Sequence, residues 1–212
     1  MSDFTALTEA VIKGDIQTAV TETQSALDAG SNVHEILDNG LIAAMDEVGH
    51  RYSKGEIFIP EMFSAARSMQ ECMKQIRPLF EKGDIGSKGI VVIGTVRQDI
   101  HDIGKNLVAM MMEGGGFTVY DLGVEVSPKK FAQKSVELKA HIVAMSALLT
   151  TTMPAMRETV EALIKTGIRE EVKVMIGGAP ITEKYAREIE ADSYAPDAGS
   201  AVIAAKRLLG IS

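Results

Sequence analysis

A short polar motif in the second half of the chain has the residue types of a metal-ligand site. The motif reads Asp99-Ile100-His101-Asp102-Ile103-Gly104. A carboxylate two residues before a histidine can accept a hydrogen bond from one ring nitrogen, which leaves the other nitrogen free to bind a metal and raises its basicity. Gly104 has no side chain and would let a bulky group approach the backbone. The motif is short, and an ordinary histidine beside helix-capping acids is the alternative.

Two further loops with unusual composition follow this motif. One reads Ser146-Ala147-Leu148-Leu149-Thr150-Thr151-Thr152, and the other contains Gly177-Gly178. Hydroxyl side chains can donate hydrogen bonds to ring nitrogens or phosphates, although helix capping and strand packing also explain them. Paired glycines indicate close backbone approach, either to a ligand or to a neighbouring element.

A predicted α/β domain positions these three loops. After Gly89, short runs rich in β-branched residues alternate with helical patterns, which predicts a doubly wound, parallel, five-stranded sheet of Rossmann-like (flavodoxin-like) type. We expect strands at 90–96, 117–122, 141–145, 172–176 and 193–194, and helices at 104–114, 128–139, 153–166, 182–190 and 198–209. Such sheets bind ligands at the carboxyl ends of their strands. Each of the three loops follows a different expected strand, so this edge is where we expect the chemistry.

The first eighty or so residues have the three- and four-residue periodicity of amphipathic helices. Asp15 can cap a helix that Gly30 ends, and Gly55 ends the next one. Pro60 fits the first turn of a further helix. With a shorter helix near residues 4–13, the pattern predicts a four-helix bundle. The polar stretch 81–88 predicts a linker, so we expect a helical domain over 1–84 and a sheet domain over 89–212.

The composition narrows the class of protein. The chain has 212 residues, with 22 basic and 29 acidic side chains and a net charge of -7. Neutralising nucleic-acid phosphates needs clustered Lys and Arg, so a nucleic-acid partner is not expected. Cys72 is the single cysteine, which rules out an intramolecular disulfide and fits a reducing compartment. The sequence shows no signal peptide and no apolar run of bilayer length, so we expect a cytoplasmic protein without a membrane partner.

Taken together, the three loops resemble those of a known family. Asp99-x-His101-x-x-Gly104, Ser146-x-Leu148 and Gly177-Gly178 are similar in order and spacing to the B12-binding domain of cobalamin-dependent methionine synthase and to the stand-alone corrinoid proteins of bacterial and archaeal methyltransferase systems. The resemblance covers nearly the whole chain. In the helical half, Val48-Gly49-x-x-Tyr52-x-x-Gly55-x-x-Phe58-Ile59-Pro60-Glu61 is similar to the segment that caps the cofactor in that family.

The resemblance implies a cofactor and a role for each matching residue. Cobalamin or a related corrinoid would bind in the base-off, His-on mode, with His101 as the axial ligand of cobalt. Asp99, His101 and Thr152 would form a proton relay, in which Thr152 stands where methionine synthase has a serine. The residues expected to contact the nucleotide tail, or to leave it room, are Gly94, Ser146, Thr150, Gly177, Gly178 and Ala198. Leu148, in the motif Ser146-x-Leu148, is also expected to bind the cofactor. The corrin ring would be contacted from below by Gln98, Ile100, Asp102, Ile103 and Gly104, and from above by Tyr52 and Ile59.

The same resemblance implies that the chain is a methyl carrier that is not catalytic on its own. Cobalt(I) would accept a methyl group through a substrate-specific methyltransferase. A second methyltransferase would then pass the methyl group to tetrahydrofolate or to a thiol such as coenzyme M, and a reductive activator would maintain the cofactor. Nothing in this sequence predicts a barrel for methanol, a methylamine, a methoxylated aromatic or a betaine, so donor binding would belong to the partner.

Three alternatives remain open at this point. The first is a B12-sensing regulatory module, although such regulators usually carry a DNA-binding segment and often a Trp, which is absent here. The second is the cobalamin subunit of a carbon-skeleton mutase, which normally lacks the cap segment. The third is a flavodoxin-like domain that binds a nucleotide or a divalent metal through Asp99 and Asp102.

Overall fold

The computed structural model describes residues 3–79 and 87–211. These residues fall into two compact units. The helical unit holds the described residues up to 79 together with 114–116, and the sheet unit holds 87–113 and the residues from 117 onward. The predicted linker 81–88 lies outside the described residues except for Ser87 and Lys88.

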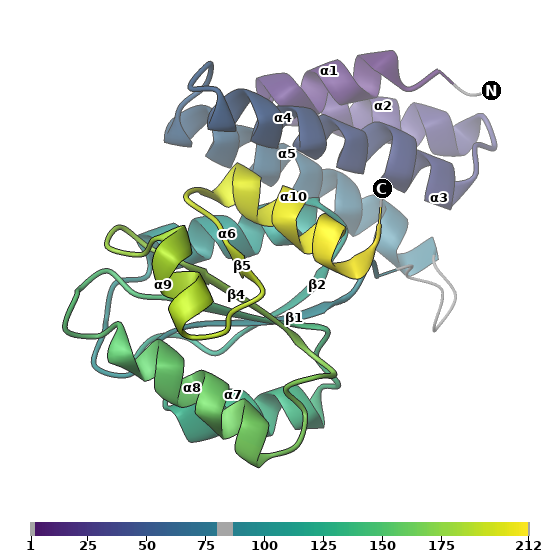
Figure 1. Ribbon diagram of the computed structural model, residues 1–212. Coiled ribbons are helices and arrows are strands. Elements are labelled where there is room, and N and C mark those ends of the chain that lie inside the picture. Colours follow the sequence, from purple (N-terminus) through teal and green to yellow (C-terminus); the bar gives the residue numbers. More distant parts are fainter. Residues whose placement is uncertain (1–2, 80–86, 212) are drawn as a thin grey trace. The chain divides into compact units, whose positions relative to one another are not determined.

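The helical unit is the predicted four-helix bundle (Figure 1). Its first helices are α1 (Thr5–Lys13) and α2 (Ile16–Asp28). The third helix is continuous but is built from α3 (Val33–Glu35), the π-helical segment η1 (Ile36–Ile42) and α4 (Ala43–Ser53). The last is α5 (Ile59–Ile76), followed by the short 3-10 turn η2 (Arg77–Leu79). Buried apolar side chains from all four helices form the core, among them Leu7, Val11, Ala19, Leu41, Met45, Met62 and Ile76.

Local sequence signals explain where these helices begin and end. The Asp15 carboxylate accepts a hydrogen bond from the Thr18 amide at 3.1 Å and so caps α2. The Phe58 amide, just before α5, donates to the Glu61 carboxylate at 2.7 Å. Gly14 turns the chain between α1 and α2 with a φ of 69°, and a Cβ there would lie 2.5 Å from that of Ser64. The turn therefore needs glycine for both conformation and space.

The π-helical segment η1 was not predicted, because its apolar spacing is also that of an ordinary helix. It contains Gly40, whose missing Cβ makes room for Leu7, since a Cβ there would lie 2.8 Å from the Leu7 Cδ2. The Gly40 carbonyl also accepts a hydrogen bond from the Thr8 hydroxyl at 3.3 Å. The widened segment thus lies directly against α1.

The sheet unit confirms the predicted Rossmann-like architecture. All neighbouring strands pair in parallel, in the order β2-β1-β3-β4-β5. The strands are β1 (Ile90–Thr95), β2 (Thr118–Asp121), β3 (Ile142–Ser146), β4 (Lys173–Gly177) and β5 (Ser193–Tyr194). The helices between and after them are α6 (Ile103–Gly114), α7 (Pro128–Glu137), α8 (Pro154–Lys165), α9 (Glu183–Glu188) and α10 (Ala198–Leu209). The predicted strand boundaries agree with these to within one residue, because the β-branched runs are short and sharply bounded.

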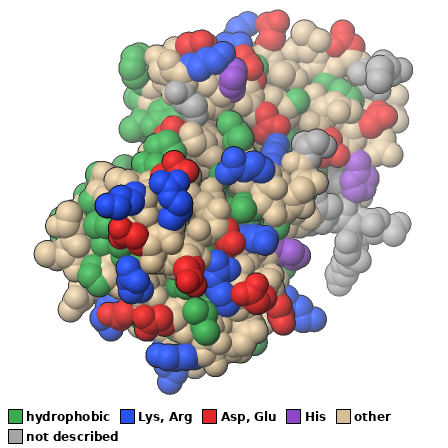
Figure 2. Space-filling model, in the orientation of Figure 1, with side chains coloured by type: hydrophobic (Ala, Val, Ile, Leu, Met, Phe, Trp, Pro, Cys, Tyr) green, Lys and Arg blue, Asp and Glu red, His purple; other side chains and the backbone are tan. Residues whose placement is uncertain are grey.

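Helices cover both faces of the sheet. α7 and α8 lie on one face, and α6 and α10 lie on the other (Figure 1). On the α7 and α8 side, Phe131, Met156 and Leu163 are fully buried against the strands. Over the face of this unit that Figure 2 shows, acidic and basic side chains are interspersed. None of the helices within the described residues is long and apolar enough to cross a bilayer.

Candidate functional site

The strand order creates the place where two of the predicted loops meet. The chain moves from β1 to β2 in one direction and then returns past β1 to β3, so the order reverses between β1 and β3. In open α/β sheets, ligands bind beyond the strand ends at this reversal point. The loop after β1 carries Asp99 and His101, and the loop after β3 carries Thr152. The backbone joins the two loops where they begin, since the Val96 amide donates to the Ser146 carbonyl at 3.0 Å.

Asp99 is the buried centre of this site. Its side chain is 0% exposed, and each carboxylate oxygen accepts two hydrogen bonds. Oδ1 accepts from the amide and the ring of His101, at 3.1 and 2.7 Å. Oδ2 accepts from the Leu148 amide at 2.8 Å and from the Thr152 hydroxyl at 2.7 Å. Asp99 is thus fully satisfied by donors from two different loops.

These hydrogen bonds decide the charge of Asp99. Burial by itself raises the pKa of this carboxyl, but the bonds from Leu148, Thr152 and His101 outweigh it, and the net effect places the pKa of Asp99 well below its usual range. Asp99 is therefore ionised at neutral pH and can only accept hydrogen bonds.

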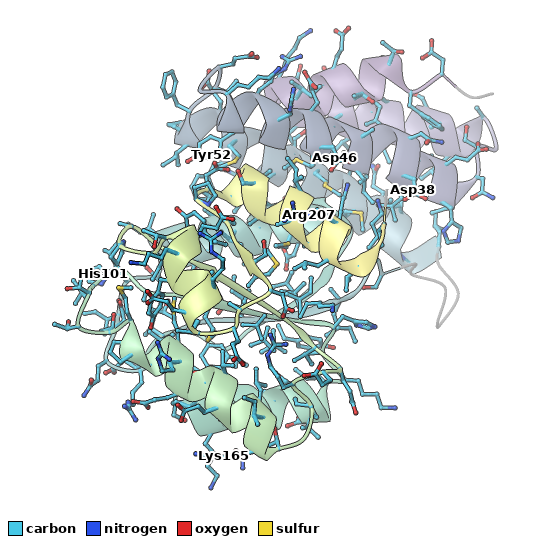
Figure 3. The ribbon with its side chains drawn as sticks, in the orientation of Figure 1. Asp38, Asp46, Tyr52, His101, Lys165 and Arg207 are labelled. Carbon is cyan, nitrogen blue, oxygen red and sulfur yellow. The ribbon has the colours of Figure 1, made fainter. Side chains whose placement is uncertain are left out.

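The charge of Asp99 determines the tautomer and the orientation of His101. Because the Asp99 carboxylate can only accept, the Nδ1 atom of His101, which lies 2.7 Å from it, carries the hydrogen. In this tautomer the free lone pair of the ring is on Nε2. The side chain is 46% exposed, and Figure 3 shows His101 at the margin of the sheet unit, beyond the strand ends. This arrangement leaves Nε2 free to accept a hydrogen bond or to bind a metal.

The same geometry argues against a nucleotide or divalent-metal site built on Asp99 and Asp102. Both oxygens of Asp99 are occupied by protein donors and are closed to solvent. Asp102 is exposed, but it accepts a hydrogen bond from the Asn106 amide group at 3.1 Å. Within the described residues, no three His, Cys, Asp or Glu side chains converge as they would around a metal ion.

Large apolar side chains are exposed on the two loops that build this site. Ile100 and Ile103, on either side of His101 and Asp102, are 68% and 73% exposed, and Leu148 on the neighbouring loop is 42% exposed. Apart from its chain neighbours and the backbone of its own helix, no described atom lies within 4 Å of the place where a side chain at Gly104 would begin. Gln98 is exposed and adopts a φ of 66°, a conformation that non-glycine residues adopt rarely and that often marks a functional loop. A broad apolar ligand can therefore approach His101 from this side.

The residues expected along the nucleotide tail occupy more varied positions. Ser146 is half-buried at the end of β3, Thr150 is exposed, and Ala198 is buried as the first residue of α10. The glycines each have a packing role within the protein. A Cβ at Gly94 would lie 2.9 Å from the Phe131 ring, one at Gly177 would lie 2.9 Å from the Ala195 carbonyl, and one at Gly178 would lie 1.9 Å from the Ala147 carbonyl. Their proposed contact with a tail stays a prediction.

Tyr52 and Ile59 lie in the helical unit. Tyr52 is half-buried near the end of α4, and Ile59 begins α5 and is 42% exposed. Their neighbours Phe58 and Phe63 are also exposed, at 68% and 37%. An exposed apolar group of this kind at a helix start is unusual for a surface. Its role above a cofactor stays a prediction.

Two contributors to the site were not predicted from the sequence. The Thr95 hydroxyl, at the end of β1, donates to the His101 carbonyl at 2.8 Å. The Leu148 amide donates to Asp99 through its backbone, so no side-chain type could have indicated it. A hydroxyl at the end of a buried strand is the only sequence signal for Thr95.

The site and fold define a class: an α/β domain that presents a carboxylate-oriented histidine at the reversal point of its sheet. Comparison with known proteins identifies the family within that class. A family model for the B12 binding domain matches residues 89–204, and a second B12 binding domain model matches residues 4–85. Dimethylamine corrinoid protein 1 of Methanosarcina acetivorans is 42% identical over 198 residues, which span 93% of this chain and 91% of the relative. The trimethylamine corrinoid protein of Methanosarcina barkeri is 42% identical over 205 residues, which span 96% and 94%.

Solved structures agree with this result. A cobalamin-binding protein from Desulfitobacterium hafniense matches with a TM-score of 0.83 and 31% identity, over 97% of this chain and 98% of that one. The methanol:cobalamin methyltransferase complex MtaBC from Methanosarcina barkeri matches with a TM-score of 0.85 and 26% identity, over 98% and 79%. This chain belongs to the family of B12-binding corrinoid proteins, as its sequence motifs indicated.

Proposed function

We propose that this chain binds cobalamin or a related corrinoid in the base-off, His-on mode and carries a methyl group between partner methyltransferases. The observation that supports the binding mode best is the state of His101. Its Nδ1 atom is committed to a buried, ionised carboxylate, so Nε2 is the ring atom available to bind the cobalt. The hydrogen bond from Thr95 to the His101 carbonyl restrains the backbone as well.

The surroundings of His101 fit the shape and polarity of a corrin ring. A corrin is a broad macrocycle whose faces are largely apolar, and Ile100, Ile103 and Leu148 offer exposed apolar surface beside the ligating ring. Gly104 leaves the approach to the backbone open. When bound, the corrinoid supplies a cobalt centre that takes up and releases a methyl group.

The support for the carrier role and for its partners comes from the similar proteins. The curated relatives are named as dimethylamine and trimethylamine corrinoid proteins, and one structural neighbour is titled a complex with a methyltransferase. We therefore propose a methylated amine as the donor, brought by a substrate-specific methyltransferase. Tetrahydrofolate or a thiol such as coenzyme M would be the acceptor through a second methyltransferase, and a reductive activator would maintain the cofactor.

The first experiment tests cofactor binding. Purified protein is mixed with hydroxocobalamin, free cofactor is removed by gel filtration, and the visible and cobalt(II) EPR spectra are recorded. We expect stoichiometric binding and a nitrogen coupling from histidine that disappears in His101→Ala. His141→Ala is the matched control, because His141 precedes β3 and lies at the amino ends of the strands. A wild-type protein that retains no corrinoid would refute the proposal.

The second experiment tests the carrier role. The holoprotein is reduced, methylated with methyl iodide, and mixed with a methyltransferase specific for tetrahydrofolate or coenzyme M. We expect loss of the methyl group from the protein and a matching amount of methylated acceptor. Stable binding without any transfer to either acceptor would instead favour the B12-sensing alternative.

A further inference from the structure

A buried lysine lies in the first turn of α6, close after His101 in the chain. Lys105 is 2% exposed, although lysine is among the residues that are least often buried. A positive charge in the first turn also opposes the helix dipole, whose positive end is there. A buried ammonium group of this kind is tolerated only if it is paired, and Lys105 is paired with the Asp121 carboxylate at the end of β2.

The partners of Lys105 connect it to both sides of the His101 loop. Its ammonium group donates to the Asn106 side chain at 2.5 Å, and the Asn106 side chain in turn donates to Asp102 at 3.1 Å. Asp102 directly follows His101 in the chain. Lys105 thus reaches the residue next to the proposed ligand through a single side chain.

A second path returns from Asp121 to His101 itself. The Gly123 amide donates to the Asp121 carboxylate at 2.8 Å, and the Gly123 carbonyl accepts from the Thr95 amide at 3.0 Å. The Thr95 hydroxyl then donates to the His101 carbonyl at 2.8 Å. Together with the chain from His101 to Lys105, these contacts form a closed ring, and the ion pair between Lys105 and Asp121 is the link that closes it.

We propose that Lys105 is a positioning residue for His101. Asp99 sets the orientation of the imidazole ring. The Lys105–Asp121 pair, linked through Asn106 to Asp102, fixes the start of α6 against the end of β2, so that the His101 backbone has one position before any cofactor arrives. The part of this inference that concerns cobalt binding by His101 rests on the proposed function. Its structural part, that Lys105 orders the His101 loop, stands on the contacts alone.

The first test uses the protein without cofactor. Hydrogen exchange of the His101 amide, which donates to Asp99, reports opening of the loop. In Lys105→Met we expect this amide to exchange about tenfold faster, while amides of the sheet core change little. Lys105→Arg keeps the charge and should restore slow exchange. The control is Lys134→Met, which removes the ammonium of an exposed ion pair with Glu137 in the same unit.

The second test measures the cobalt(II) EPR spectrum of the same variants after loading with hydroxocobalamin. Lys105→Met should show a several-fold lower ratio of histidine-bound to histidine-free cobalt, and Lys105→Arg should recover it. A folded Lys105→Met with wild-type exchange at His101 and a wild-type ratio would overturn the proposal, since a residue that only stabilises the fold would lower the melting temperature and leave both signals unchanged.

Asn106→Ala covers the case in which Lys105→Met does not fold. It removes the bridge from Lys105 to Asp102 without leaving a buried charge unpaired, because Asn106 is exposed and the pair with Asp121 remains. Faster exchange at His101 supports the proposal, and unchanged exchange contradicts it. If wild-type protein shows no histidine on cobalt, the proposed binding mode fails, while the exchange experiment still decides whether Lys105 orders the loop.

Discussion

Asp99 and Thr152 lie 53 residues apart in the chain, yet the Thr152 hydroxyl donates to the Asp99 carboxylate at 2.7 Å. The carboxylate divides its two oxygens between two loops. Oδ1 serves His101 in its own loop, and Oδ2 serves Leu148 and Thr152 after β3. The orientation of the proposed cobalt ligand is therefore set jointly by the loops on both sides of the reversal point.

The Thr152 hydroxyl should control the ionisation of Asp99. Thr152→Val keeps the shape of the buried side chain but removes a donor that lowers the pKa of Asp99, so that pKa should rise. Loss of a hydrogen bond to a charged group should also cost roughly 1–3 kcal/mol of unfolding free energy. The measurement is a carbon NMR titration of the Asp99 carboxyl, together with urea unfolding.

Thr152→Ser is the matched control for this prediction. It retains the hydroxyl and loses only a methyl group, so the pKa of Asp99 should stay at its wild-type value. An equal rise in both variants would show that packing of the loop, and not the hydroxyl, sets the ionisation of Asp99.

The low pKa of Asp99 predicts a specific dependence of stability on pH. In the unfolded chain this carboxyl titrates near a pKa of about 3.9. Because its pKa in the folded state is lower, the unfolded state binds more protons in acid, and the stabilisation from Asp99 is present above about pH 4 and is lost as the pH falls further. Asp99→Asn should therefore be less stable than wild type at pH 7, by roughly 1–3 kcal/mol or more, and this difference should shrink below about pH 4.

Urea unfolding of the cofactor-free proteins at pH 7, 5, 4 and 3 measures this difference directly. Taking the difference between wild type and Asp99→Asn cancels the other titrating groups. Glu161→Gln is the control, since Glu161 is exposed on α8 of the same unit and its loss should matter little at any pH. A difference that stays constant down to pH 3 would contradict the assigned role of the Asp99 charge.

Much of this site could be predicted from the sequence because its parts follow strands. β-branched runs located the strands, and chemistry-bearing residues after β1 and β3 necessarily meet at one edge of a parallel sheet. The bundle was predictable from helical periodicity, but the π-helical segment at Ile36–Ile42 was not, because both kinds of helix share that apolar spacing.

Other features could not be predicted, because the residue type indicates a different environment or gives no signal. Lysine is normally exposed, so nothing in the sequence indicated that Lys105 is buried beside Asp121. The Leu148 amide contributes through its backbone. The glycine pair at 177–178 was consistent with either a ligand or a neighbouring element, and the structure places protein atoms where both side chains would begin.

Gly178 should not tolerate any side chain. Its φ is 127°, and a Cβ would lie 1.9 Å from the Ala147 carbonyl oxygen, which belongs to the backbone and has little room to move. Gly178→Ala should therefore cost at least about 3 kcal/mol of unfolding free energy or prevent folding. Thermal unfolding of the cofactor-free protein tests this. A variant with near wild-type stability would mean that the loops after β3 and β4 rearrange easily.

Gly104 should behave in the opposite way, and it separates the needs of the fold from those of the cofactor. It lies in the first turn of α6, and its φ is not positive. Apart from its chain neighbours and the backbone of its own helix, no described atom lies within 4 Å of the position where a side chain would begin. Alanine is the better helix former, so Gly104→Ala should leave the cofactor-free protein equally stable or stabilise it by up to about 1 kcal/mol. The same methyl group would stand in the open approach beside His101, so hydroxocobalamin should bind at least about tenfold more weakly. Thermal unfolding and equilibrium dialysis measure the two effects separately, and unchanged affinity in a stable Gly104→Ala variant would mean that the corrin ring does not approach the start of α6.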